Sequence, residues 1–153
     1  MAGFSTVELR AAYGYLSASA DITVTTGGTF VDIDGTFDDQ LLEQFIRDRT
    51  EVIYDGFSDA KFKIDWTISL SSEDAGRLVH VGARISREGL TTSTAGVQSV
   101  YAENADQIYS LSGTRVVTLA DADPVEFQLT SDTDGDVITI TGFNFSITEI
   151  RGN

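Results

Sequence analysis

Apolar and polar residues alternate along much of this chain, and the clearest case is residues 61–72, KFKIDWTISLSS. A period of two is that of a β-strand with one buried face, because successive side chains point to opposite sides of a sheet. The predicted buried face consists of Phe62, Ile64, Trp66, Ile68 and Leu70. Residues 77–86 and 125–131 show the same alternation. The pattern therefore predicts an all-β protein.

Shorter segments with turn residues between them bring the prediction to about eight strands. The further strands are predicted near residues 22–24, 30–33, 51–54, 97–102, 107–119 and 137–150. Gly113-Thr114 is expected to bend or break the strand that contains it. Many short strands with turns between them are typical of a β-sandwich or jelly roll. Residues 21–153 are therefore predicted to form one jelly-roll β-sandwich domain.

Residues 1–20 differ from the rest, and two interpretations remain open. Ser5 and Glu8 have the spacing of a capping box, and apolar residues follow without a glycine until Gly14, which predicts a short helix. The alternative is an extended N-terminal arm that lies on a neighbouring subunit, because a weakly apolar terminal segment has little to bury alone.

Residues 38–47, DDQLLEQFIR, are ambiguous between helix and strand. Leu41, Leu42, Phe45 and Ile46 match helical spacing. The flanking segments are short and rich in β-formers, which favours a strand with a turn at Asp48-Arg49 and a partner strand at residues 51–54.

The last predicted strand changes phase. Its apolar residues are even-numbered up to Ile140 and odd-numbered from Phe143, so one residue must be gained or lost near Gly142. A β-bulge at Thr141-Gly142 would do this. The alternative is a long strand covered on both faces.

Composition narrows the range of functions. The 153 residues include 24 acidic and 10 basic ones, a net charge of −14, which argues against nucleic acid as a partner. The chain has no cysteine, so disulfides and thiolate chemistry are excluded. No apolar run approaches the ~20 residues of a membrane span and no secretory signal is visible, so we expect a protein made in the cytoplasm with no membrane partner.

Two groups of residues raise the question of chemistry. Asp132, Asp134 and Asp136 in the segment DTDGD resemble part of a calcium loop, but position twelve of that loop would be Phe143 instead of glutamate. A type I′ hairpin turn at Asp134-Gly135 explains the same spacing without metal. His80 is the only histidine, which excludes a multi-histidine metal site. We predict no catalytic residues, no cofactor and no enzyme activity.

From Tyr54 onward, the order of elements resembles the tumour-necrosis-factor-like and complement-globular-head-like jelly rolls that recur in phage structural proteins. The matching pieces are Tyr54-Asp55-Gly56 before the strand at 61–72, the strand at 77–86, the turn REG at 87–89, a Ser/Thr-rich stretch, the strand ending VVTL, the acidic turn ADADP, VEFQL and a last strand ending in Ile147 and Ile150.

This resemblance implies a homotrimer on the surface of a virion, assembled in the host cytoplasm. The chain has no stalk sequence, so a capsid decoration or cement protein fits better than a fibre. Its partners would be its own copies and the major capsid protein or other virion proteins. The N-terminal arm would contact the capsid or a neighbouring protomer through Phe4, Val7, Leu9, Tyr13, Tyr15 and Leu16.

Two other functions remain open. A receptor- or carbohydrate-binding module at a fibre tip would use Arg87, Glu88 and Tyr101 in its ligand loops. A hydrolase of cell-wall sugar would use paired carboxylates, which are numerous here but cannot be placed at the required separation from sequence.

Overall fold

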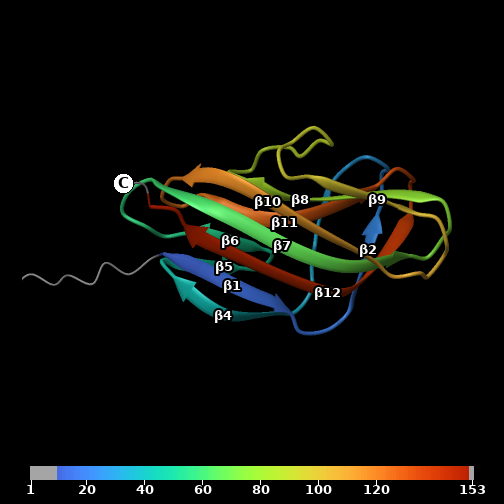
Figure 1. The fold of residues 1–153 in the computed structure, drawn as a ribbon, viewed down its shortest axis with the longest axis horizontal. Coiled ribbons are helices and arrows are strands. Elements are labelled where there is room, and N and C mark those ends of the chain that lie inside the picture. Colours follow the sequence, from blue (N-terminus) through green and yellow to red (C-terminus); the bar gives the residue numbers. More distant parts are fainter. Residues whose placement is uncertain (1–9, 152–153) are drawn as a thin grey trace, which may run out of the picture.

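The computed structural model describes residues 10–151 as a sandwich of two antiparallel β-sheets (Figure 1). Its strands are β1 (Ala11–Leu16), β2 (Ala20–Val24), β3 (Val31–Asp32), β4 (Phe37–Glu43), β5 (Phe45–Asp48), β6 (Glu51–Tyr54), β7 (Ala60–Ser72), β8 (Arg77–Ile85), β9 (Gln98–Ala102), β10 (Tyr109–Leu119), β11 (Pro124–Ser131) and β12 (Asp136–Glu149). No helix of the described chain is long and apolar enough to span a membrane. The all-β prediction is confirmed.

The central strand is β12 in one sheet, called sheet A, and β11 in the other, called sheet B. Sheet A has the order β10-β7-β12-β1-β4, and β2 pairs with the first part of β12 beyond the end of β1. Sheet B has the order β5-β6-β11-β8-β9, and β3 pairs with β11. The chain crosses between the sheets repeatedly, so neighbours within a sheet are seldom neighbours in sequence.

The core lies between the sheets and is rich in aromatic rings. The five apolar residues predicted to share the inner face of β7 are all at most 2% exposed. Phe127 of sheet B meets Phe143 of sheet A edge to face, with 5.0 Å between ring centroids. Such pairs add about 0.5–1.5 kcal/mol to the effect of burying apolar area.

Gly113 does not break its strand, because β10 runs through it without interruption and pairs with β7 along its whole length. Trp66 lies directly opposite Gly113 in this pairing. A Cβ atom on Gly113 would lie 2.3 Å from the indole carbon Cζ2 of Trp66. The glycine therefore gives the indole ring its space at the edge of the core.

The predicted bulge in β12 is present. The register between β12 and β7 shifts between Ile140 and Gly142. Because of this shift, Ile138 and Ile140 before it and Phe143 and Phe145 after it all face the core. The bulge interpretation is confirmed.

The N-terminal prediction needs correction for residues 10–20. Residues 11–16 form β1, which pairs with β12 on one side and β4 on the other, so they are neither helical nor an arm outside the sandwich. Leu16 is a core residue, 8% exposed, and not a contact residue. The strand signal was weak because its inward positions include Gly14, where a Cβ would lie 2.7 Å from the Asp38 carbonyl oxygen. Phe4, Val7 and Leu9 lie outside the described residues.

Residues 38–47 are extended, as predicted, but they contribute to two strands. Gln44 separates β4 in sheet A from β5 in sheet B and has a φ of 61°. This left-handed residue turns the chain from one sheet to the other. The predicted pairing of residues 45–48 with 51–54 is confirmed.

The Asp134-Gly135 hairpin prediction is wrong. β11 belongs to sheet B and β12 to sheet A, so the turn between them crosses the sandwich. Of the two central residues Asp134 and Gly135, only Gly135 has a positive φ, 75°, whereas a type I′ turn requires a positive φ at both. A local turn sequence does not say in which sheet the next strand will pair.

Candidate functional site

The outer side of sheet A carries a continuous area of small uncharged side chains. β10, β7 and β12 lie side by side there, and their outward residues are mostly Ser, Thr and Asn because the inward positions hold the apolar core. We call this surface the uncharged face, and it consists of Thr67, Ser69, Ser110, Ser112, Thr141 and Asn144.

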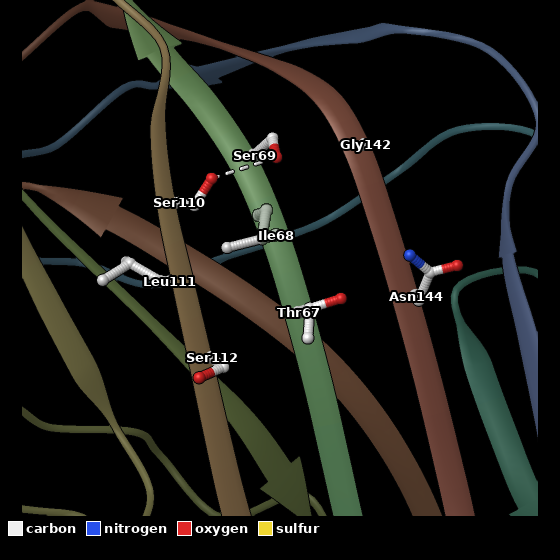
Figure 2. Close-up of a pocket in the computed structure, with 8 residues that line it drawn as sticks. All are labelled: Thr67, Ile68, Ser69, Ser110, Leu111, Ser112, Gly142 and Asn144. Carbon is white, nitrogen blue, oxygen red and sulfur yellow. Dashed lines mark hydrogen bonds between the residues drawn. The ribbon is translucent and has the colours of Figure 1, made fainter.

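A shallow hollow of about 300 Å³ lies on the uncharged face, between the three strands (Figure 2). Gly142 at the bulge contributes no side chain, and the hydroxyls of Ser69 and Ser110 lie 3.4 Å apart across the hollow. The side chains of Thr67, Ser112 and Asn144 make no hydrogen bond within residues 10–151. The hollow therefore offers donors and acceptors to a partner.

The charges on sheet A lie around the uncharged face and not within it. Asp65, the next outward residue of β7 before Thr67, lies opposite Ser146 of β12 and forms an ion pair of 3.7 Å with Lys63. Asp21 and Asp38 lie on β2 and β4. Desolvating a charge is costly, and the centres of protein interfaces are depleted of charged residues. In a chain of net charge −14, a surface without charged side chains can be covered by another copy at low electrostatic cost.

Tyr13 and Tyr15 border the uncharged face on β1. They pair in register with Ser146 and Asn144 and are 46% and 37% exposed. The Tyr15 hydroxyl donates a 2.9 Å hydrogen bond to the Asp38 carboxylate, which raises the pKa of Tyr15. Tyrosine is enriched in interfaces. That these two residues contact another subunit or the capsid stays a prediction. The uncharged face beside them is a surface that could belong to the same contact.

A second, charged hollow of about 410 Å³ lies on sheet B around Glu126. Arg84 and the Thr50 hydroxyl both donate to the Glu126 carboxylate, and Arg84 and Arg87 lie 3.7 and 3.4 Å from Glu51. Burial raises the pKa of Glu126, against the hydrogen bond from Thr50, and the nearby Asp32 raises it further.

The pKa of Glu126 gives a pH-dependent prediction. Because folding raises this pKa, the stability that Glu126 contributes is present below its unfolded pKa and is lost as pH rises through its folded pKa. The Gln side chain in Glu126→Gln stays neutral at every pH. The free energy of unfolding of this variant, relative to that of the wild type, should therefore be higher at about pH 7 than at about pH 3.5. Urea unfolding of both proteins at the two pH values measures the difference.

Glu149→Gln is the matched control with the opposite sign. Burial alone would raise the pKa of Glu149, but hydrogen bonds from the Arg10 backbone and from Arg151 lower it. The stability that Glu149 contributes is present above its unfolded pKa and is lost as pH falls through its folded pKa. The free energy of unfolding of Glu149→Gln, relative to that of the wild type, should therefore be lower at neutral pH than at low pH. The same trend in both variants would contradict the assignment for Glu126.

Arg87, Glu88 and Tyr101 do not form one ligand site. Tyr101 pairs with Leu78 near the start of β8, whereas Arg87 and Glu88 follow the end of β8 at Ile85. Seven residues of strand, about 23 Å, separate the two places. Arg87 lines the charged hollow, whereas Glu88 binds Arg115 and accepts from the backbone N–H of Ile85.

The three aspartates of DTDGD have separate partners. Asp132 accepts from the backbone N–H of Leu78 at 3.2 Å, and Asp134 accepts from that of Gly27 at 2.6 Å. Asp136 is buried and accepts from the hydroxyls of Ser72 and Ser131 at 2.9 and 2.7 Å. Among residues 10–151, no three His, Cys, Asp or Glu side chains converge on a metal site. These carboxylates stabilise the turn between β11 and β12 and its contacts with neighbouring segments.

His80 forms a cross-strand pair on sheet B. Its ring nitrogen Nδ1 shares a hydrogen bond with the hydroxyl of Ser99, its register partner on β9. Burial lowers the pKa of His80, against the effect of Asp132. Within residues 10–151, no carboxylate is hydrogen-bonded to this ring, as one would be in a catalytic triad.

Comparisons with known proteins agree with this architecture. The alignment with the Eiger TNF of S. frugiperda covers 95% of this chain and 94% of that one, at 12% identity and a TM-score of 0.60. The PRD1 vertex protein P5 is similar over 93% and 97%, at 12% identity and 0.54. The globular domain of zebrafish complement 1qA is similar over 95% and 100%, at 13% identity and 0.50.

These likenesses define the class: the fold is a jelly roll of the TNF/C1q type, as predicted, and folds of this type typically form homotrimers. The structural neighbours are non-enzymatic proteins. No protein-family model matches the chain, and no curated protein matches its sequence.

Proposed function

We propose that this protein is a non-enzymatic structural protein of a virion, which binds the outside of a phage head as a homotrimer and reinforces it. The observation that carries the proposal is the uncharged face, a neutral surface of Ser, Thr and Asn on a jelly roll of net charge −14. Burying this face between copies leaves most carboxylates in water.

The place on a virion is supported by the fold. One protein with the same fold is a vertex protein of the phage PRD1. A trimer presents every contact three times, so modest contacts add up to firm attachment and resist the internal pressure of the head together. The segment 1–9, with Phe4, Val7 and Leu9, is proposed to contact the capsid, and sheet B to face solvent.

A second candidate is a receptor- or carbohydrate-binding module at a fibre tip. The charged hollow favours it, because Arg87, Asp34 and Asp48 at its rim could bind sugar hydroxyls. A glycan array separates the two candidates: specific glycan binding that requires Arg87, in a protein that does not bind heads, would favour the fibre tip.

The direct test is binding to phage heads purified from a mutant that lacks this protein. The wild-type protein is expected to co-sediment with the heads, to saturate at a fixed number of trimers per head and to raise the temperature at which the heads release DNA. Heads that neither bind the protein nor gain heat resistance would contradict the proposed function.

A further inference from the structure

The loop between β6 and β7, residues 55–59, carries the most exposed large apolar side chain of the described chain. Phe57 is 100% exposed. Burying a phenylalanine side chain stabilises a fold, so a fully exposed phenylalanine contributes none of that stabilisation. The sequence DGFSD gave no periodic signal, so the pattern of apolar residues does not predict this position.

This loop is tied firmly to the sandwich. The buried Tyr54 hydroxyl donates to the Ser58 carbonyl oxygen and accepts from an Arg10 guanidinium N–H, both at 2.7 Å. Asp55 donates its backbone N–H to the Gln44 carbonyl at 2.8 Å. These bonds hold the base of the loop in place while Phe57 points into solvent. A loop whose backbone is already held in place loses less conformational entropy on binding.

Gly56 is required for this arrangement. A Cβ atom at this position would lie 1.9 Å from the Tyr54 hydroxyl oxygen. The glycine lets the loop pass close over the tyrosine ring and brings Phe57 to the tip.

The surroundings of Phe57 indicate the chemistry of its partner. Asp55 and Asp59 flank it, and neither carboxylate makes an ion pair within residues 10–151. A complementary surface would have an apolar pocket bordered by Lys or Arg. Phenyl rings that enter such pockets are typical anchors of protein interfaces.

The loop lies at the end of the sandwich where β1 starts and β12 ends (Figure 1). Arg10, the first described residue, binds the Tyr54 hydroxyl at the base of this loop. The half-exposed Ile150 lies at the same end, with its backbone N–H bonded to the Lys61 carbonyl at 2.8 Å.

We infer that this end of the sandwich faces the phage head and that Phe57 is the anchor, inserted into an apolar pocket bordered by basic side chains on the capsid protein. The inference rests on the proposed function. A trimer presents three such anchors, which strengthens attachment through multivalency.

The test compares Phe57→Ala with Tyr101→Ala in the head-binding assay. Tyr101 is a matched control, because it is an exposed aromatic residue, 58% exposed, on β9. Phe57→Ala is expected to weaken binding at least about tenfold with the melting temperature and the mass in solution unchanged, since the side chain has no contact to lose. Tyr101→Ala should bind like the wild type, and Phe57→Leu should keep part of the affinity.

The outcomes separate the inference from the proposed function. Wild-type affinity in Phe57→Ala, or equal weakening in Tyr101→Ala, would overturn the anchor while leaving the head-binding role intact. Failure of the wild-type protein to bind heads would overturn both. Loss of head binding in Phe57→Ala but not in Tyr101→Ala supports the anchor. A weaker dependence of head binding on salt concentration in Asp59→Asn supports the basic border of the pocket.

Discussion

Thr67→Glu is expected to break the proposed trimer into folded monomers. Thr67 lies at the centre of the uncharged face, between Ser112 on β10 and Asn144 on β12. A glutamate here would have to lose its hydration without a cationic partner, which costs several kcal/mol in each subunit. Sedimentation equilibrium should give about three times 16.5 kDa for the wild type and about 16.5 kDa for the variant.

Ser99→Glu is the matched control for this experiment. It introduces the same charge at an exposed position on β9, in the other sheet, where the new carboxylate replaces the hydroxyl that is hydrogen-bonded to the ring of His80. The control should keep the mass of the wild type, and circular dichroism should show the same β-structure in all three proteins. If Thr67→Glu keeps the wild-type mass, the uncharged face is not the subunit interface. A monomeric wild type would contradict self-trimerisation.

Gly113→Ala is expected to lower the free energy of unfolding by about 1–3 kcal/mol. The added methyl group would lie 2.3 Å from the Trp66 ring and 2.8 Å from the Gly96 carbonyl oxygen, so neither neighbour allows a simple relief of the clash. At this chain length, each kcal/mol lowers the melting temperature by roughly 2–4 °C. Urea unfolding followed by the fluorescence of Trp66, the single tryptophan, measures the change at the site itself.

Gly89→Ala provides the comparison, because a Cβ there meets nothing within 4 Å. It should unfold within about 1 kcal/mol of the wild type, since only the flexibility of the unfolded chain changes. Equal stability of the two alanine variants would mean that the indole does not occupy the space beside Gly113.

Local alternation predicted most strands because it reports directly which side chains a sheet buries. In β12 it even predicted the bulge, since Ile140 and Phe143 cannot both face the core without an extra residue between them. β1 was missed because its inward positions, Ala12 and Gly14, are small, and a small residue contributes little to a hydrophobic pattern.

The pattern of apolar and polar residues does not predict which strands pair when they are far apart in the sequence. The segment around Gly135 was predicted as a hairpin because turn chemistry is local, whereas the choice of sheet depends on which strands already pair with β11 and β12. The same limit hid the uncharged face. Thr67, Ser112 and Asn144 are visible as polar positions in three separate segments, but only the topology makes them neighbours.

The position of β12 at the centre of sheet A has a consequence for the order of folding. β1, β2 and β7 all pair with this strand, which is the last to be synthesised among the described strands. Sheet A therefore cannot be completed before β12 has been made, and the earlier strands keep part of their apolar faces uncovered until then. Such non-local pairing makes folding slow and exposes the chain to aggregation. We expect the newly made chain to depend on rapid synthesis of β12, or on protection by chaperones, far more than a helical protein of the same length.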